Sequence, residues 1–170
     1  MADGDVLGTQ KRGRRIALSK EELDAFLVES RTCRVATLTS SGAPHVSPLW
    51  YVWDGTSLWL YSIVKSQRWA DILRDPRVAV VVDAGHDFFE LHGVELRGTL
   101  EQVGEAPRTG AESIPELAAA ERLFAAKYFD GEQNMYHDGR HGWVRLTPAK
   151  IASWDHRKIA GLNGGGQAPA

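Results

Sequence analysis

The chain has 170 residues, and its 20 lysines and arginines against 22 aspartates and glutamates leave a net charge of −2. That length predicts one domain with a core of its own. The near-neutral charge argues against a nucleic-acid partner, and no apolar run approaches the ~18 residues that a membrane crossing needs. A single cysteine excludes an internal disulfide, and no signal-peptide pattern opens the chain. We therefore expect a cytoplasmic protein that binds a small molecule or another protein.

The two ends differ in composition from the middle. Residues 1–15 combine glycine, aspartate and basic residues with almost no large apolar side chains, which predicts a flexible arm. Residues 163–170 are rich in glycine and alanine and predict a disordered tail. The folded domain is therefore placed at residues 16–162. The basic cluster of the arm is interpreted as a solvated charge run, and the alternative is contact with RNA or with an anionic cofactor tail.

The first half of this domain predicts one helix and a three-stranded meander. Ser19 and Glu22 form a capping box that starts a helix over about residues 20–30. Three extended, alternating runs follow, at residues 33–39, 44–53 and 57–63. Turn residues separate the first two runs, and Asp54-Gly55 between the last two is a strong hairpin signal.

The second half changes period several times. Residues 65–75 have helical spacing, with Trp69, Ile72 and Leu73 on one side, and Pro76 ends the helix. A second helix is expected to begin near Ile114-Pro115 and to end at Tyr128. The extended runs are at 78–82, at 90–103 with bends expected at Gly93 and Gly98, and at 141–146 and 150–155, which meet at Thr147-Pro148-Ala149.

These elements predict a mainly β (α+β) fold. The sum is six or seven antiparallel strands and about three helices, with no alternation of strands and helices that would build a parallel sheet. We therefore expect a small antiparallel β-barrel with helices on its edges.

No self-sufficient catalytic or metal-binding constellation is visible in the sequence. His137 and His141 have four-residue spacing, but the turn residues between them would keep them off a common helix face, so no metal site is predicted. Cys33 begins an apolar strand and is interpreted as a core residue. Most of the six tryptophans are interpreted as core or interface residues.

The segment from Tyr61 to Arg68 is the first candidate binding site. It contains two serine hydroxyls, an amide and two cations, namely Ser62, Ser66, Gln67, Lys65 and Arg68. A helix that starts here would offer unpaired N–H groups and a favourable dipole to an anion, and the cations would add charge-assisted hydrogen bonds. The pattern therefore predicts a phosphate site. The alternative is an ordinary capped helix start whose basic side chains point to water.

The second candidate lies one strand earlier, where Pro48 interrupts the run from Val46 to Trp50. Proline donates no ladder hydrogen bond and is therefore expected at an edge or a bulge. Neighbouring backbone groups are then available to a planar polar ligand such as the edge of a flavin ring. Trp50 and Tyr51 are candidates to border that ring.

Four segments together support a family resemblance. They are CRVATLTSSGAPHVSPLWYVWDGTSLWLYS from Cys33, KSQRWADILRDPRVAVVVD from Lys65, ELRGTLEQV from Glu95 and KIASWDHRK from Lys150. Over about residues 19–160 the chain resembles the pyridoxamine 5'-phosphate oxidase-like (PNPOx-like) split-barrel flavoproteins. Within these it is most similar to the B branch of actinobacterial deazaflavin (coenzyme F-420)-dependent oxidoreductases. The resemblance implies a homodimer of six-stranded split barrels with cofactor sites in grooves between the subunits.

The resemblance also implies site residues. The strand that lines the flavin or deazaflavin ring matches Ser47, Pro48, Leu49 and Trp50. The phosphate-binding strand end and helix start match Ser62, Lys65, Ser66, Gln67, Arg68 and Trp69. The closing strand brings Trp154 and Lys158 toward the groove of the same or the other subunit. The chain departs from true pyridoxamine phosphate oxidases over residues 104–139 and in lacking their full basic set for the vitamin substrate, so vitamin oxidation is not expected.

Three functional hypotheses follow. The leading one is an oxidoreductase that uses reduced coenzyme F-420 to transfer hydride to an unsaturated small organic substrate, since hydride chemistry resides in such a cofactor and the protein binds and orients it. FMN in the same groove is the alternative, because the ring and the ribityl phosphate are shared. The third is a non-enzymatic flavin or haem-binding protein, with His86, His137 or His141 as candidate axial ligands. Four aromatic residues are candidates for shaping the groove, namely Phe88, Phe89, Tyr128 and Tyr136.

Overall fold

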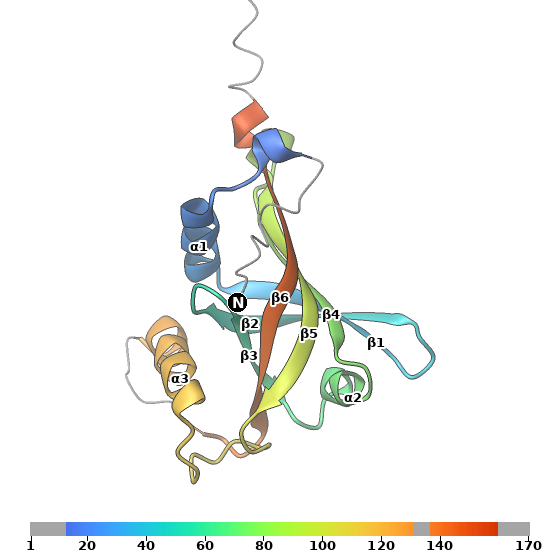
Figure 1. The fold of residues 1–170 in the computed structure, drawn as a ribbon, viewed down its shortest axis with the longest axis vertical. Coiled ribbons are helices and arrows are strands. Elements are labelled where there is room, and N and C mark those ends of the chain that lie inside the picture. The colour runs from blue at the N-terminus through green and yellow to red at the C-terminus, as the bar shows by residue number, and fades with distance from the viewer. Residues whose placement is uncertain (1–12, 131–136, 160–170) are drawn as a thin grey trace, which may run out of the picture.

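The computed structural model describes residues 13–130 and 137–159 (Figure 1). Its strands are β1 (Thr32–Leu38), β2 (Pro44–Trp53), β3 (Leu58–Ile63), β4 (Arg77–Ala84), β5 (His92–Val103) and β6 (His141–Asp155). Its helices are α1 (Lys20–Glu29), α2 (Gln67–Arg74) and α3 (Pro115–Tyr128), with 3-10 turns η1 (Arg14–Ile16) and η2 (Phe88–Glu90). Residues 1–12 of the predicted arm and the whole predicted tail lie outside the described residues.

The six strands form one closed antiparallel barrel in the order β1-β2-β3-β6-β5-β4. The predicted meander is confirmed, because β1 pairs with β2 and β2 with β3. The predicted capping box is also confirmed: the Glu22 N–H donates to the Ser19 hydroxyl (3.2 Å), and the Ser19 N–H donates to the Glu22 carboxylate (2.7 Å). None of the described helices is both long enough and apolar enough to span a bilayer.

The prediction of two closing strands was wrong, because β6 runs without interruption through Pro148. The β5–β6 register changes between Arg97 and Gly98, which leaves Ala149 without a partner while Pro148 lies opposite Gly98. Such a bulge lets a proline remain inside a strand, since its missing N–H coincides with a break in the ladder. A Cβ on Gly98 would come within 2.9 Å of the Thr147 carbonyl oxygen, so the bulge also requires this glycine.

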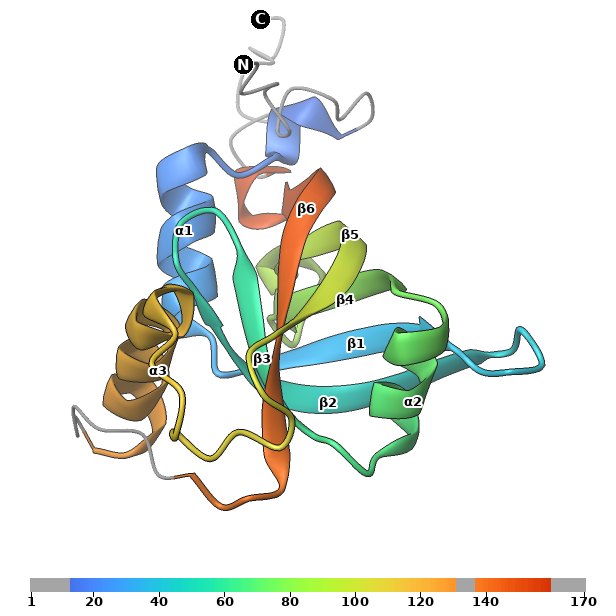
Figure 2. The ribbon, with the colours of Figure 1, turned by 60° about the horizontal axis from the view of Figure 1, so that its bottom comes forward.

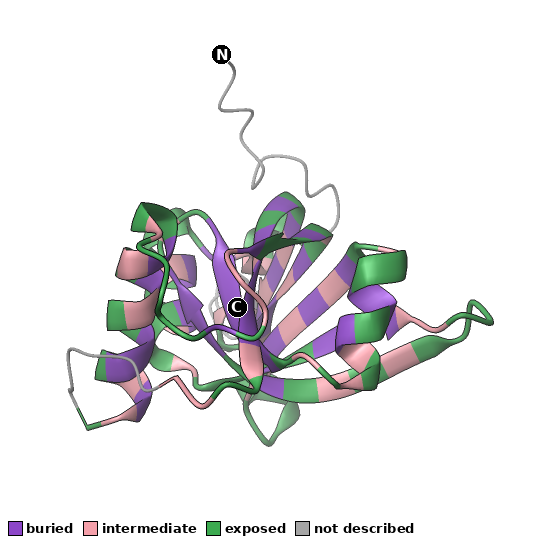
Figure 3. Cartoon of the chain, turned by 90° about the horizontal axis from the view of Figure 1, so that it is seen from below, coloured by how far each residue is buried: buried purple, intermediate pink, exposed green. Residues whose placement is uncertain are grey.

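The apolar side chains of the strands fill the barrel and a second layer outside it. The first cluster occupies the barrel interior and includes Cys33, whose side chain is 0% exposed and whose thiol pKa burial raises to about 12. The second cluster joins α3 to the outer face of β2, β3 and β6, with Phe124 and Trp143 at its centre. Figure 3 shows the buried residues alternating with exposed ones along the strands. The predictions of a core cysteine and of mostly buried tryptophans are confirmed.

The helices cover opposite sides of the barrel, with α1 and α3 on one side and α2 on the other (Figure 2). On α2, Trp69 and Ile72 are buried as predicted, but Leu73 is 63% exposed. The side chain that is buried in its place is Asp71, which is 0% exposed. The buried face of α2 therefore combines two apolar side chains with one charged side chain, where the sequence suggested three apolar ones.

One part of the barrel wall is split. Strands β2 and β3 pair at only three positions, from Tyr51↔Leu60 to Trp53↔Leu58. Beyond them β2 continues along β1 as far as Pro44, while β3 continues along β6 as far as Ile63. The two strands therefore diverge and leave a gap, and this gap positions the candidate site.

Candidate functional site

A cavity of about 360 Å³ opens at this gap between β2 and β3. Its lining comes from β2, β3, α2, the end of α3 with its C-cap, and the turn that leads into β6. The residues are Pro48, Leu49, Trp50, Tyr61, Ile63, Arg68, Phe124, Phe129, Asp138 and His141. Small-molecule sites are commonly apolar hollows of ~300–1,000 Å³ with a few placed polar groups. The cavity has this composition, with four polar or charged side chains among apolar and aromatic ones.

Arg68 spans the gap from its place in the first turn of α2. Its Nη1 donates to the Ser47 hydroxyl on β2 (2.6 Å), and its Nε and Nη2 donate to the Ser62 hydroxyl on β3 (3.3 and 3.1 Å). The side chain is therefore aimed by one hydroxyl from each of the two diverging strands. A guanidinium held in this way is pre-organised for an anion.

The charge of Arg68 is not met by a carboxylate. Desolvation lowers the pKa of its guanidinium, which marks a cation that is partly withdrawn from water. Within residues 13–130 and 137–159, no acidic side chain lies within ion-pair distance of it. Buried charges are ordinarily paired, so this cation favours an anionic ligand in the cavity.

The backbone of β2 faces the gap along one edge, and the contacts of Tyr128 show which edge it is. The Tyr128 hydroxyl accepts a hydrogen bond from the Tyr51 N–H (3.1 Å) and lies 2.6 Å from the carbonyl oxygen of Arg31. Arg31 directly precedes β1, so this hydroxyl fills the next position of the β1–β2 ladder. The backbone groups of Tyr51 therefore point toward β1.

Hydrogen-bonded and non-hydrogen-bonded pairs alternate along an antiparallel ladder. Since Tyr51 points toward β1, the residues Trp50, Pro48 and Val46 direct their backbone groups to the other edge, where β3 has diverged. Pro48, which has no N–H, lies on this edge, so its missing donor removes no hydrogen bond from the β1–β2 ladder. The Trp50 amide and the carbonyls beside it are thereby available to the edge of a planar ligand.

Aromatic side chains form the wall of the cavity that faces α3. The ring of Trp50 stacks on that of Tyr128 (centroids 4.5 Å apart, planes at 8°), although Trp50 remains 48% exposed. The ring of Phe124 lies 5.7 Å from that of Tyr61. Flat, rigid surfaces of this kind suit a planar ring system.

The remaining wall contains a histidine held by an aspartate. His141 Nδ1 lies 2.7 Å from an Asp138 carboxylate oxygen, and the imidazole stacks on the Tyr61 ring (4.7 Å, 22°). Burial alone would raise the pKa of Asp138, but hydrogen bonds from the Arg140 N–H and from His141 lower it. The Tyr61 hydroxyl is buried without a hydrogen-bond partner among the described residues, and burial raises its pKa to about 12.

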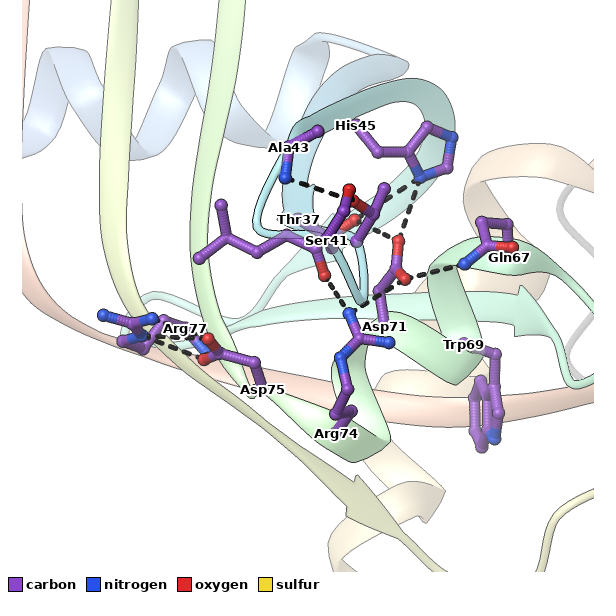
Figure 4. Close-up of polar contacts among 12 residues, drawn as sticks. Thr37, Ser41, Ala43, His45, Gln67, Trp69, Asp71, Arg74, Asp75 and Arg77 are labelled. Atoms are coloured by element: carbon purple, nitrogen blue, oxygen red, sulfur yellow. Dashed lines mark hydrogen bonds and ion pairs between the residues drawn. The ribbon is translucent and has the colours of Figure 1, made fainter.

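A second polar cluster lies farther along α2 and serves the fold (Figure 4). The Asp71 carboxylate accepts from Thr37 (3.1 Å) and Gln67 (2.8 Å) and also contacts His45 Nδ1 (3.2 Å) and Arg74 (3.2 Å). Burial opposes its ionisation, but these hydrogen bonds outweigh burial and lower the pKa of Asp71. The cluster fastens α2 to the β1–β2 hairpin.

The structure brings together six of the residues that the sequence singled out. Around the gap lie Ser47, Pro48, Leu49, Trp50, Ser62 and Arg68. Of the four aromatic candidates for shaping the groove, Tyr128 lies behind Trp50, whereas Phe88 and Phe89 are exposed on η2 and Tyr136 lies outside the described residues.

Other predicted site residues have different surroundings. Ser66 caps α2 by accepting from the Trp69 N–H (3.2 Å), Gln67 is held by Asp71, and Lys65 is exposed. Trp69 is only 3% exposed and points away from the Asp71 cluster into the core, so direct contact with a ligand is not expected of it.

Two more predicted site residues belong to the far end of β6 and its extension. Trp154 is paired with Gly93 of β5, and Lys158 donates to the Ala17 carbonyl (2.8 Å) and contacts Glu22. Neither lines the cavity of its own chain.

Sequence reasoning missed Asp138 and its pairing with His141. It named His141 only as a candidate haem ligand and Tyr61 only as the start of the first candidate segment. The available signal was the position of His141 at the start of a strand, directly after the turn Asp138-Gly139-Arg140. That turn was interpreted as an argument against a metal site, whereas it brings the aspartate back onto the histidine. Within the described residues no group of three metal-binding side chains is found.

The side chains and backbone groups around the cavity fit a flavin-type cofactor. Arg68 and the two serine hydroxyls suit a phosphate, and the open edge of β2 suits the polar rim of a ring. The Tyr61 hydroxyl, buried without a partner in the described part of the chain, is a further group that a ligand in the cavity can satisfy.

Comparisons with known proteins agree with this geometry. A conserved hypothetical protein, Rv2991, from Mycobacterium tuberculosis is 29% identical, with a TM-score of 0.73, and the match covers 95% of this chain and 97% of that one. An F420 reductase is 21% identical (TM-score 0.55; 76% and 94% covered). The haem storage protein HutZ from Vibrio cholerae is 14% identical (TM-score 0.61; 79% and 93% covered). The last two likenesses show the fold alone.

No curated protein matches the sequence. The family model described as pyridoxamine 5'-phosphate oxidase matches residues 19–155, from the N-cap of α1 to the end of β6. This span contains all six strands and every residue that lines the cavity. The chain therefore belongs to the pyridoxamine 5'-phosphate oxidase family of split-barrel proteins.

Proposed function

We propose that this protein is an oxidoreductase that uses the reduced deazaflavin coenzyme F-420 to transfer hydride to an unsaturated small organic molecule. The observation that supports this most is Arg68, a cation held by two serine hydroxyls at the mouth of an aromatic cavity without a carboxylate within ion-pair distance in the described chain. The family membership and the F420 reductase of the same fold support the same reading.

In this proposal the chain binds and orients the cofactor. Arg68, Ser47 and Ser62 hold the phosphate, and the gap-facing backbone of Pro48 and Trp50 holds the polar rim of the ring. The bound coenzyme supplies the hydride chemistry. The aromatic wall excludes water from the ring, which favours transfer to an organic acceptor.

A second copy of the chain completes the proposed site. Val46 (60% exposed) and Trp50 (48% exposed) lie on the same outer face of β2, beside the cavity. Apolar side chains of this size on one strand suit a protein interface. We therefore propose a homodimer with its cofactor grooves between the subunits. Light scattering is expected to give twice the chain mass, and Val46→Asp is expected to give a monomer that binds cofactor more weakly.

FMN is the alternative cofactor, because the same phosphate and ring contacts serve it. The test is a fluorescence titration of the purified protein with coenzyme F-420 and with FMN at one ionic strength, with haem as a third ligand followed by its Soret band. Micromolar or tighter binding of F-420 with much weaker FMN binding supports the proposal. Preference for FMN selects the alternative, and a Soret band lost on His141→Ala, without flavin binding, contradicts both.

The groove assignment has its own control on α2. Arg68→Gln is expected to weaken binding of the preferred cofactor strongly, whereas Lys65→Gln removes an exposed charge of the same sign two residues before the helix. Equal affinities in both variants and the wild type would remove the phosphate site from Arg68.

A further inference from the structure

The cavity contains four titratable side chains, and they differ in their capacity to transfer a proton near neutral pH. They are Tyr61 of β3, Arg68 of α2, Asp138 and His141. Burial raises the pKa of Tyr61 to about 12, and hydrogen bonds lower that of Asp138. Arginine stays protonated at all ordinary pH values. Imidazole is the side chain that ordinarily gains and loses a proton between pH 5 and 8.

We propose that His141 is the proton donor of this site and that Asp138 is the positioning residue that orients it. The inference rests on the proposed function, since it assigns the proton that accompanies the hydride. Asp138 accepts the Nδ1–H of the imidazole at 2.7 Å, which leaves Nε2 as the nitrogen that can deliver a proton. The stacked Tyr61 ring fixes the plane of the imidazole.

The surroundings of His141 and Asp138 contain no other acid that lines the cavity among the described residues. Its side chain is 25% exposed, so it can recover a proton from solvent. From α3 and its C-cap, the cavity lining in the described chain includes Phe124 and Phe129 but no acid, and Glu121 of α3 is engaged by Arg108 (2.8 Å) and His137 (3.2 Å). Arg68 contributes a fixed positive charge to the cavity. Asp138 is therefore the acid that fixes the tautomer of His141.

The proposed step balances as a two-electron reduction of a conjugated double bond. A deazaflavin or flavin held by Arg68, Ser47 and Ser62 would supply the hydride for the β-carbon, and the π electrons would move toward the α-carbon. The α-carbon takes the proton from Nε2 of the His141 imidazolium, which becomes neutral. Solvent then returns the proton. The acceptor is an alkene conjugated to a carbonyl or a similar electron-withdrawing group, because only such an acceptor stabilises the charge before protonation.

The fold supplies a matched control in a second histidine–aspartate pair. His45 Nδ1 lies 3.2 Å from the Asp71 carboxylate, and its side chain is 31% exposed, but it does not line the cavity. His141→Gln and His45→Gln therefore remove the same group from similar partners, once inside the proposed site and once outside it.

The experiment combines three measurements on the wild type, on both glutamine variants and on Asp138→Asn. Fluorescence titration gives cofactor affinity, ¹⁵N NMR of the imidazoles gives tautomer and contact, and single-turnover reduction of cyclohex-2-en-1-one from pH 5.5 to 9 gives the rate. We expect cofactor to shift the His141 signals and leave those of His45 unchanged. We expect His141→Gln to bind cofactor within about threefold of wild type and to lose ~10²-fold or more in rate at pH 6.

Asp138→Asn is expected to shift the proton between Nδ1 and Nε2 and to lower the rate without changing cofactor affinity. The proposal is overturned if cofactor binds and the His141 signals do not move, or if His141→Gln reduces the enone as fast as His45→Gln. If the wild type binds cofactor without reducing this enone, the NMR signals decide between the two outcomes. A shift of the His141 signals on cofactor binding supports the proposal, and unchanged His141 signals overturn it. Failure of the wild type to bind any flavin or deazaflavin contradicts the proposed function, and the proton donor with it.

Discussion

Arg108 is buried and Arg68 is half-buried, and their guanidinium groups have different partners. Arg108 is 5% exposed and donates to two carboxylates, Glu105 (2.7 Å) and Glu121 (2.8 Å). Among the residues that the structure describes, Arg68 donates to the hydroxyls of Ser47 and Ser62 and to no carboxylate. The buried cation Arg108 is neutralised by the fold, whereas the half-buried Arg68 keeps its charge in the lining of a cavity.

The difference separates a structural arginine from one available to a ligand. The ion pairs of Arg108 tie the loop after β5 to α3, and the backbone N–H of Arg108 donates to the His141 carbonyl (2.6 Å). The hydroxyls around Arg68 fix its direction without cancelling its charge. An arginine whose hydrogen-bond partners are neutral hydroxyls is therefore a candidate to bind an anionic ligand.

The strongest way to test this comparison is to remove Arg108. Arg108→Met leaves Glu105 and Glu121 without their shared cation, and breaking a buried ion pair from one side costs about 3–5 kcal/mol. We expect the free energy of unfolding, measured by urea denaturation, to fall by that amount. Arg68→Met is the control, and it is expected to cost much less. Equal losses of stability in the two variants would mean that the hydroxyl contacts of Arg68 are structural as well.

The converse effect is expected on ligand affinity. Arg68→Met removes a charge-assisted contact worth about 1.5–3 kcal/mol, so cofactor binding should weaken by about 10- to 150-fold. Arg68→Lys keeps the charge but loses the fork that reaches both serines, and an intermediate affinity is expected. Isothermal calorimetry with the preferred cofactor measures both. An unchanged Kd in Arg68→Met would show that the uncancelled charge has no role in binding.

Smaller effects are expected from the serines that aim Arg68. Ser47→Ala and Ser62→Ala each remove a hydroxyl partner, which costs about 1 kcal/mol in cofactor affinity. Ser62, which is 1% exposed and contacts two nitrogens of the guanidinium, should have the larger effect. A double variant that binds as weakly as Arg68→Met would show that orientation and charge are inseparable here.

The acids around Arg108 also predict a pH dependence of stability. Burial opposes the ionisation of Glu105, but hydrogen bonds from its own N–H and from Arg108 outweigh it and lower its pKa from 4.5 to about 2. A lowered folded pKa adds stability above pH 4.5 that is lost as pH falls toward 2. Denaturation midpoints of Glu105→Gln should therefore depend less on pH in this window than those of the wild type. Parallel curves would contradict the assignment.

Local patterns in the sequence were sufficient for most of the fold. The capping box at Ser19, the alternating runs of the first three strands and the proline at the start of α3 are short-range signals, and all appear in the structure. The errors arose where a distant partner decides. Pro148 stays inside β6 because Gly98 on another strand permits the bulge, and Leu73 is exposed because Asp71 is held by the β1–β2 hairpin.

The candidate site divides in the same way. Pro48 in a strand and the cluster of Ser62 and Arg68 at a helix start could be recognised from residue types alone, because edge prolines and cationic helix starts have chemistry of their own. The sequence singled out Trp69 and Gln67 as candidate cofactor-binding residues on the same grounds as Arg68. Their roles depend on which side of α2 faces the barrel. In the structure Trp69 is buried in the core, and Gln67 donates a hydrogen bond to Asp71.

By itself the sequence determined the barrel class, the family, and the cationic helix start after β3, since these follow from periodicity and from motifs of neighbouring residues. The tertiary structure alone decided that β2 and β3 diverge, that Arg68 bridges the two strands without a carboxylate partner in the described chain, and that Asp138 and His141 line the same cavity. The physical reason is the distance along the sequence over which each interaction acts. Propensity acts over a few residues, whereas the direction of a side chain and the partners of a buried charge depend on strands that the chain brings together from far apart.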